Sequence, residues 1–198
     1  MSFEIITQFE DKVAEFYGAK YGIAIDSCTH GIELCLRHQQ IEKLITPSRT
    51  YLSVPFLANK LNIPLEWSDE EWEDYYYLGG TNIIDGAVHW KENGYKDGTF
   101  LCLSFQFQKH LSLGRGGMIL TNDEHSASIL KKMSYDGRTP DKPWRTQNID
   151  TIGYHYYMTP ETAQLGLDKL EEAKRSEPRK WKIEDWPDLR KMEIFKNG

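Results

Sequence analysis

Hydrophobic residues recur at two spacings along the chain, and the two spacings predict alternating helices and strands. Ile6, Phe9, Val13 and Phe16 repeat at helical spacing and are followed by Gly18, which predicts an amphipathic helix that ends there. The same reasoning predicts helices after residue 27, over 54–61, over about 126–135 and over 159–173. Short apolar runs predict strands at 21–25, 43–46, 64–67, 82–85, 99–105 and 118–121, and residues 75–77 also fit a strand.

Strands that alternate with helices predict an α/β fold with a mostly parallel sheet flanked by helices. Ligands bind beyond the carboxyl ends of the strands in such sheets, so polar residues that close an apolar run are candidate site residues. Asp26, Ser27, Asp85 and Ser104 all occupy such positions. Each of them could equally be a turn-former or a helix cap with no further role.

The charge and cysteine content narrow the class of protein. Residues 1–173 form the predicted domain, and residues 174–198, which are highly charged and contain Pro178 and Pro187, are predicted to be a tail or arm. The net charge of −6 gives no reason to expect binding to nucleic acid or to an anionic membrane. No apolar run approaches the roughly 20 residues of a membrane helix, and the first residues lack a signal-peptide pattern. Three cysteines in apolar surroundings fit reduced thiols, and no zinc-binding spacing is present, so we expect a cytoplasmic protein without a metal.

Lys109 is the residue whose position is hardest to explain by a purely structural role. It stands five positions after Ser104, between the apolar run 99–105 and the glycine-rich turn 114–117. Burying an ammonium group is costly, and a partly desolvated lysine has a lowered pKa and becomes nucleophilic towards carbonyl carbons. Schiff-base chemistry requires such a lysine, although a surface lysine in a loop is the plainer alternative.

Several short motifs follow one another in a consistent order over about residues 9–170. They are Asp26-Ser27-Cys28-Thr29, Thr46-Pro47-Ser48-Arg49-Thr50-Tyr51, Asp85-Gly86-Ala87, Ser104-Phe105-Gln106-Phe107-Gln108-Lys109, Gly114-Arg115-Gly116-Gly117, Asp136-Gly137-Arg138 and Gly153-Tyr154-His155-Tyr156-Tyr157-Met158. Together they resemble the DegT/StrS family of sugar aminotransferases, which use pyridoxal 5'-phosphate and have fold type I. The resemblance implies the large domain of that fold, with the small C-terminal domain missing or reduced.

The resemblance assigns the chemistry to two residues. Lys109 would bind the aldehyde of the cofactor as a Schiff base and then move a proton between cofactor and substrate carbons. Asp85 would pair with the pyridine nitrogen and keep it protonated, so that the ring accepts electrons. Both residues are therefore predicted to be catalytic, and both also contact the cofactor.

The remaining cofactor contacts come from four other positions in the resemblance. Tyr51 would stack on the ring, while the Cys28 and Thr29 amides and the Ser104 hydroxyl would hold the phosphate. His155 would reach the phosphate bound by the neighbouring subunit. The resemblance thus also implies a homodimer whose subunits share their sites.

The implied reaction moves an amino group from a donor such as glutamate onto a keto-sugar, expected to be nucleotide-linked, in sugar or cell-surface glycan biosynthesis. Three positions depart from the family pattern: Cys28 replaces a glycine, Val88 replaces a glutamine or histidine, and Tyr157 replaces an arginine. These departures concern the substrate pocket more than the cofactor site. A different class of function is a shortened relative that keeps the fold, with or without the cofactor, as a binding or scaffold module without amino transfer.

Overall fold

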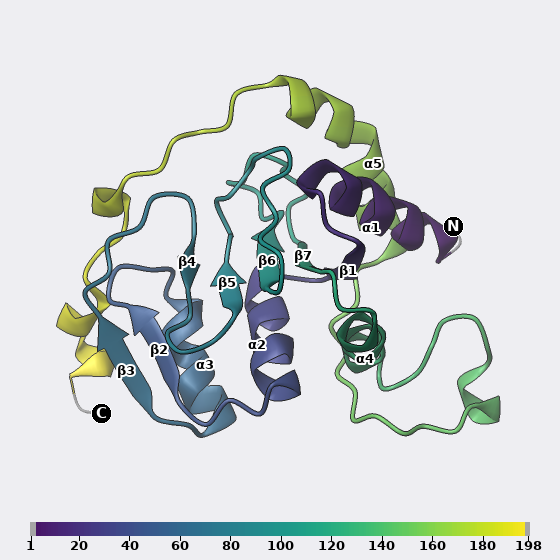
Figure 1. Cartoon of the computed structure of the whole chain (residues 1–198), viewed down its shortest axis with the longest axis horizontal. Helices are drawn as coiled ribbons and strands as arrows, with labels where there is room; N and C mark the ends of the chain where they lie inside the picture. Colours follow the sequence, from purple (N-terminus) through teal and green to yellow (C-terminus); the bar gives the residue numbers. More distant parts are fainter. Residues whose placement is uncertain (1–2, 197–198) are drawn as a thin grey trace.

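The computed structural model describes residues 3–196 and has three layers, with helices on both sides of a sheet (Figure 1). In chain order the elements are α1 (Glu4–Tyr17), β1 (Tyr21–Ile25), α2 (Cys28–His38), β2 (Leu44–Pro47), α3 (Ser53–Leu61), β3 (Leu65–Ser68), β4 (Tyr76–Tyr77), β5 (Ile83–Asp85), β6 (Phe100–Ser104), β7 (Gly117–Thr121), α4 (Glu124–Ser134), η1 (Trp144–Thr146), α5 (Pro160–Arg175), η2 (Ile183–Asp185), η3 (Leu189–Lys191) and η4 (Glu193–Phe195), where η marks a 3-10 helix. The predicted helices and strands are all present, with ends that shift by a few residues.

The sheet is mixed, which corrects the prediction of a mostly parallel sheet while confirming the α/β class. The main sheet has the order β1-β7-β6-β5-β4, and β2 pairs with β3 in a second, parallel sheet. Within residues 3–196 the main sheet contains a single parallel pair, β5 with β6, and its other three pairs are antiparallel. The periodicity of a strand shows which face is buried, but it carries no information about strand direction.

The connections between strands explain these directions. Residues 78–82 join β4 to β5, and so short a link can only return the chain antiparallel, because a parallel crossover needs a dozen or more residues. Residues 86–99 between β5 and β6 are long enough for a parallel crossover, although they form no helix. The amide of Gly79 donates to the carbonyl of Ile45 at 2.9 Å and so joins the β4 end of the main sheet to β2.

The two faces of the sheet have separate apolar cores. One core packs strand residues against α2, α3 and α4, and the other packs alternate strand residues against α1 and α5. The first includes Ile23, Ile25, Cys102 and Ile119, and the second includes Ala24, Leu101, Leu103, Met118 and Leu120. The three cysteines are free thiols and buried, as expected. Among the described residues, no helix has both the length and the apolar character to cross a bilayer.

Residues 176–196, which we call the C-terminal arm, leave the end of α5 and run across the edge of the sheet to the side of β3 (Figure 1). Trp186 and Leu189 are buried, and Leu189 donates its amide to the carbonyl of Ser48 at 2.9 Å. The side chain of Arg49 donates to the carbonyl of Trp186 at 2.7 Å. These contacts fasten the C-terminal arm onto the domain.

Candidate active site

A cavity of about 580 Å³ opens where β5 and β6 end and α2 begins. Volumes of roughly 300–1,000 Å³ are usual for cofactor and small-molecule sites. Six of the seven predicted site residues line it: Cys28, Thr29, Tyr51, Asp85, Ser104 and Lys109. The other walls come from the loop between β6 and β7 and from the C-terminal arm. The fold therefore gathers side chains from five separate parts of the chain at one place.

Asp85 is the buried anion of this cavity. It is the last residue of β5 and only 5% exposed. Its Oδ2 accepts a hydrogen bond from the Tyr76 hydroxyl at 2.6 Å, and its Oδ1 accepts one from the amide of Ala87 at 3.0 Å. Burial raises the pKa of Asp85, while these two donors and the charge of Lys109 act in the opposite direction. A positive group placed in the cavity would stabilise the ionised carboxylate further.

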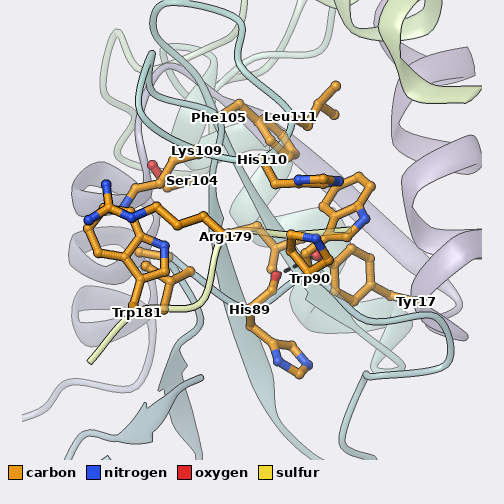
Figure 2. A pocket seen from close by; sticks show the side chains of 14 residues that line it. Tyr17, His89, Trp90, Ser104, Phe105, Lys109, His110, Leu111, Arg179 and Trp181 are labelled. Atoms are coloured by element: carbon orange, nitrogen blue, oxygen red, sulfur yellow. Dashed lines mark hydrogen bonds between the residues drawn. The ribbon is translucent and has the colours of Figure 1, made fainter. Parts of the chain in front are cut away.

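Lys109 reaches the same cavity from the loop after β6. Its Nζ lies 4.9 Å from the centre of the Trp181 ring and 5.7 Å from that of Trp186, both on the C-terminal arm. Figure 2 shows the Arg179 side chain beside the Trp181 ring, next to Lys109 and Ser104; the guanidinium carbon lies 3.9 Å from the ring centre. Burial lowers the pKa of Lys109, although the nearby charge of Asp85 opposes this. Lys109 thus has the environment that a nucleophilic amine needs.

The first turn of α2 lines one end of the cavity. The side chain of Ser27 caps the helix by accepting a hydrogen bond from the amide of His30 at 3.3 Å, and Thr29 Oγ1 lies 2.6 Å from Ser53 Oγ. Gly117 of β7 lies so close that a Cβ there would be 2.5 Å from the Cys28 amide nitrogen, so glycine is needed at this approach. Amides at a helix start attract anions, and a phosphate suits this position.

The side chain of Cys28 turns away from that helix start and into the protein. Its Sγ lies 3.5 Å from the carbonyl oxygen of Cys102 and 3.8 Å from Asp85 Oδ1. Burial, reinforced by the charge of Asp85, raises the pKa of the Cys28 thiol well above its usual value. Cys28 is therefore a neutral thiol that donates to its neighbours, and its side chain packs beside Asp85 where the family pattern has glycine.

His155 is the predicted site residue that does not line this cavity. Its side chain is 71% exposed, and its Nδ1 lies 3.1 Å from each carboxylate oxygen of Asp136. The segment that carries it runs beside the end of α4, where His155 forms a bridge with Tyr135. His155 is thus a surface residue of its own chain.

Two features of the site escape sequence reasoning. Tyr76 reads from the sequence as an ordinary strand residue, yet its hydroxyl binds Asp85. Trp181 and Trp186 lie in a segment predicted to be a tail or arm, yet they line the cavity beside Lys109. The alternation of residues 75–77 shows that Tyr76 faces opposite to its neighbours, but no local signal pairs it with Asp85.

The order of these residues and their common cavity agree with a comparison to known families. The sequence profile of the DegT/DnrJ/EryC1/StrS aminotransferase family matches residues 2–64 and 86–186. The chain belongs to this family. The internal stretch between the two matched segments, residues 65–85, contains β3, β4 and β5 and therefore both Tyr76 and Asp85.

Individual relatives match this chain over most of its length. The spore coat polysaccharide biosynthesis protein SpsC of Bacillus subtilis (strain 168) is 26% identical over 218 residues, covering 83% of this chain and 56% of SpsC. GDP-perosamine synthase of Caulobacter vibrioides (strain ATCC 19089) is 25% identical, covering 84% of this chain and 56% of that enzyme. The crystal structure of AtS13 from Actinomadura melliaura has the same fold, with a TM-score of 0.75 at 18% identity, over 87% of this chain and 61% of AtS13. This chain therefore spans a little over half the length of these proteins.

Proposed function

We propose that this protein is an aminotransferase that uses pyridoxal 5'-phosphate. The main support for this proposal is that Lys109 and Asp85 line one cavity with the start of α2, in a chain of the DegT/DnrJ/EryC1/StrS aminotransferase family. Amino transfer requires an amine that binds an aldehyde and an acid partner for the pyridine nitrogen. A buried lysine with a lowered pKa and a buried carboxylate are the residues that meet those two needs.

The donor set of the cavity fits pyridoxal phosphate. The first turn of α2, with the hydroxyls of Thr29 and Ser104, suits a phosphate, and the exposed ring of Tyr51 can cover one face of the pyridine. When bound, the cofactor supplies an electron sink for the bonds at the substrate amine carbon. Of the three departures from the family pattern, Cys28 lies in this donor set, and its thiol points towards Asp85 and Cys102.

The residues of the chain have separate tasks in this reaction. Asp85 would provide the negative charge for the ring nitrogen of the cofactor, and Tyr76 and the Ala87 amide donate hydrogen bonds to its oxygens from the protein side. Lys109 would be the amine that holds the cofactor aldehyde and would take up or return a proton at its Nζ, because its lowered pKa leaves a larger neutral fraction than an ordinary lysine has. Trp181 and Trp186 exclude water from the Lys109 side of the cavity.

For the substrate, we propose a keto-sugar linked to a nucleotide, with glutamate as the amino donor. One relative, GDP-perosamine synthase, is named for a nucleotide-linked amino sugar, and SpsC is named for polysaccharide biosynthesis. The work of such an enzyme belongs to sugar and cell-surface glycan biosynthesis. We place it in the cytoplasm, where Cys28, Cys35 and Cys102 would stay reduced.

We further propose that the active unit is a homodimer in which His155 reaches the phosphate site of the partner. His155 lies outside the cavity of its own chain and is exposed, as a residue that acts across an interface must be before assembly. The neighbouring loop also exposes Trp144, Ile149 and Ile152. Exposed aromatic and branched side chains of this kind favour an interface between proteins.

The proposal is tested by adding pyridoxal phosphate to the purified protein and then borohydride. We expect a visible covalent adduct that borohydride reduces, with the mass of the reduced cofactor on the peptide that contains Lys109. Glutamate added before reduction should convert the bound cofactor to its amine form. Lys109→Ala should abolish the adduct, and Lys91→Ala, at an exposed lysine, should leave it intact.

The outcomes separate the two classes of function. A wild-type protein that forms no reducible adduct would contradict the aminotransferase proposal. An adduct on Lys109 that never reacts with an amino donor would instead favour a binding or scaffold protein that retains the cofactor.

A further inference from the structure

Tyr76 contacts Asp85 from a part of the chain that the family profile does not cover. Its side chain is 1% exposed, and its hydroxyl donates to Asp85 Oδ2 at 2.6 Å. The same hydroxyl lies 2.5 Å from Thr50 Oγ1. Asp85, Tyr76 and Thr50 therefore form a buried chain of hydrogen bonds at the floor of the cavity.

The backbone fixes this contact as firmly as the side chains do. Tyr76 and Asp85 lie directly opposite each other in the antiparallel β4–β5 pair, so their side chains leave the same face of the sheet. The ring of Trp72 packs on Tyr76 with their centres 5.0 Å apart. The phenol consequently has little freedom to leave the carboxylate.

The electrostatics give the hydrogen bond a definite direction. Burial and the charge of Asp85 raise the pKa of Tyr76 well above its usual value, so the phenol keeps its proton and donates it. The Thr50 hydroxyl can then donate to the phenol oxygen. A hydrogen bond to a buried carboxylate is among the stronger ones in proteins, because one partner is charged.

No other side chain near Asp85 provides an equivalent contact in the described structure. The Cys28 thiol is 3.8 Å from Asp85 Oδ1 and is a weak donor. His89, next to the Val88 position where the family has glutamine or histidine, directs its Nε2 to the carbonyl of Gly94 at 3.2 Å. Its ring lies against Tyr17 and Tyr75 instead of Asp85.

We propose that Tyr76 is the positioning residue of Asp85, and that Thr50 orients the Tyr76 phenol for this task. Tyr76 holds the carboxylate in one orientation and favours its ionised form, so that Asp85 can keep a pyridine nitrogen protonated. This inference rests on the proposed function, since it concerns how Asp85 acts on the bound cofactor.

The test compares Tyr76→Phe with Tyr77→Phe, which removes a hydroxyl from the neighbouring, exposed tyrosine. Both variants should form the reducible adduct on Lys109. Tyr76→Phe should slow the reaction of the bound cofactor with glutamate by about 10- to 100-fold, the loss expected for one hydrogen bond to a charged group. Tyr77→Phe should react at the wild-type rate.

A second readout distinguishes positioning from a general structural effect. Pyridoxal phosphate labelled with ¹⁵N in the ring reports by NMR whether that nitrogen is protonated. We expect the ring nitrogen of Tyr76→Phe to lose its proton at a lower pH than in wild type. Two other titratable side chains, Cys28 and Lys109, also face Asp85, and both are present in wild type and in Tyr76→Phe.

Each outcome bears on one proposal. A wild-type protein that binds no cofactor contradicts the proposed function, whereas equal glutamate rates and equal ring-nitrogen titrations in wild type and Tyr76→Phe overturn only this inference. If thermal unfolding shows that Tyr76→Phe is not folded, Thr50→Val replaces it. That variant keeps the Tyr76 phenol but removes the hydroxyl that orients it. The ring nitrogen should again lose its proton at a lower pH than in wild type, and an unchanged pH of deprotonation overturns the inference.

Discussion

The C-terminal arm should contribute measurably to the stability of the domain, and Leu189 is the residue that tests this. Its side chain is 1% exposed, and its amide bonds to the carbonyl of Ser48, so Leu189 belongs to the packed interior despite its place in a charged segment. Leu189→Ala removes buried methyl groups and leaves a cavity. Substitutions of this kind cost about 2–5 kcal/mol of unfolding free energy.

That loss corresponds to a lower melting temperature. A chain of 198 residues loses roughly 2–4 °C for each kcal/mol, so Leu189→Ala should melt about 4–20 °C below wild type. Ile194→Ala is the matched control, because Ile194 lies on the same arm but is 66% exposed. It should change the unfolding free energy by less than about 0.5 kcal/mol.

Circular dichroism melts and denaturant titrations measure both variants. Trypsin provides an independent assay, since Arg179, Lys180 and Lys182 precede the buried Trp186. We expect faster cleavage at these residues in Leu189→Ala than in wild type under native conditions, because the C-terminal arm is released more often. Equal stability and equal cleavage in Leu189→Ala and Ile194→Ala would refute the reasoning that the arm is packed as part of the domain.

Two further predictions concern the site. Burial raises the pKa of Asp85 above its ordinary 3.8, so the folded state binds this proton more tightly and wild-type stability falls as pH rises from 3.8 through the raised pKa. Denaturant titrations should show that the unfolding free energy of Asp85→Asn falls less over this pH range. The same variant should bind cofactor but transfer amino groups slowly. An equal fall in unfolding free energy together with unchanged turnover would remove Asp85 from the site. Mixing His155→Ala with Lys109→Ala chains should restore activity through heterodimers with one intact site, whereas verified subunit exchange without recovery would contradict the role of His155 across the interface.

Local patterns were sufficient for the elements and for the candidate residues at the strand ends, Asp85 and Ser104 among them. The apolar periodicity of residues 21–25 and 99–105 predicts β1 and β6, because side-chain burial alternates or becomes continuous over a few neighbouring residues. The resemblance to the DegT/StrS family implied that Asp85, Ser104 and Lys109 share one site, and all three line one cavity. Strand ends and the loops that follow them are local features, so the sequence alone can locate them.

Strand direction and the contacts across the fold were decided only by the tertiary structure. The short link 78–82 turns β4 antiparallel to β5, and that pairing brings Tyr76 opposite Asp85. Trp181 meets Lys109 only because the C-terminal arm returns across the sheet edge, with Leu189 buried at its far side. Each of these contacts joins residues from different elements, and its energy depends on burial by the whole fold, which no spacing along the chain records.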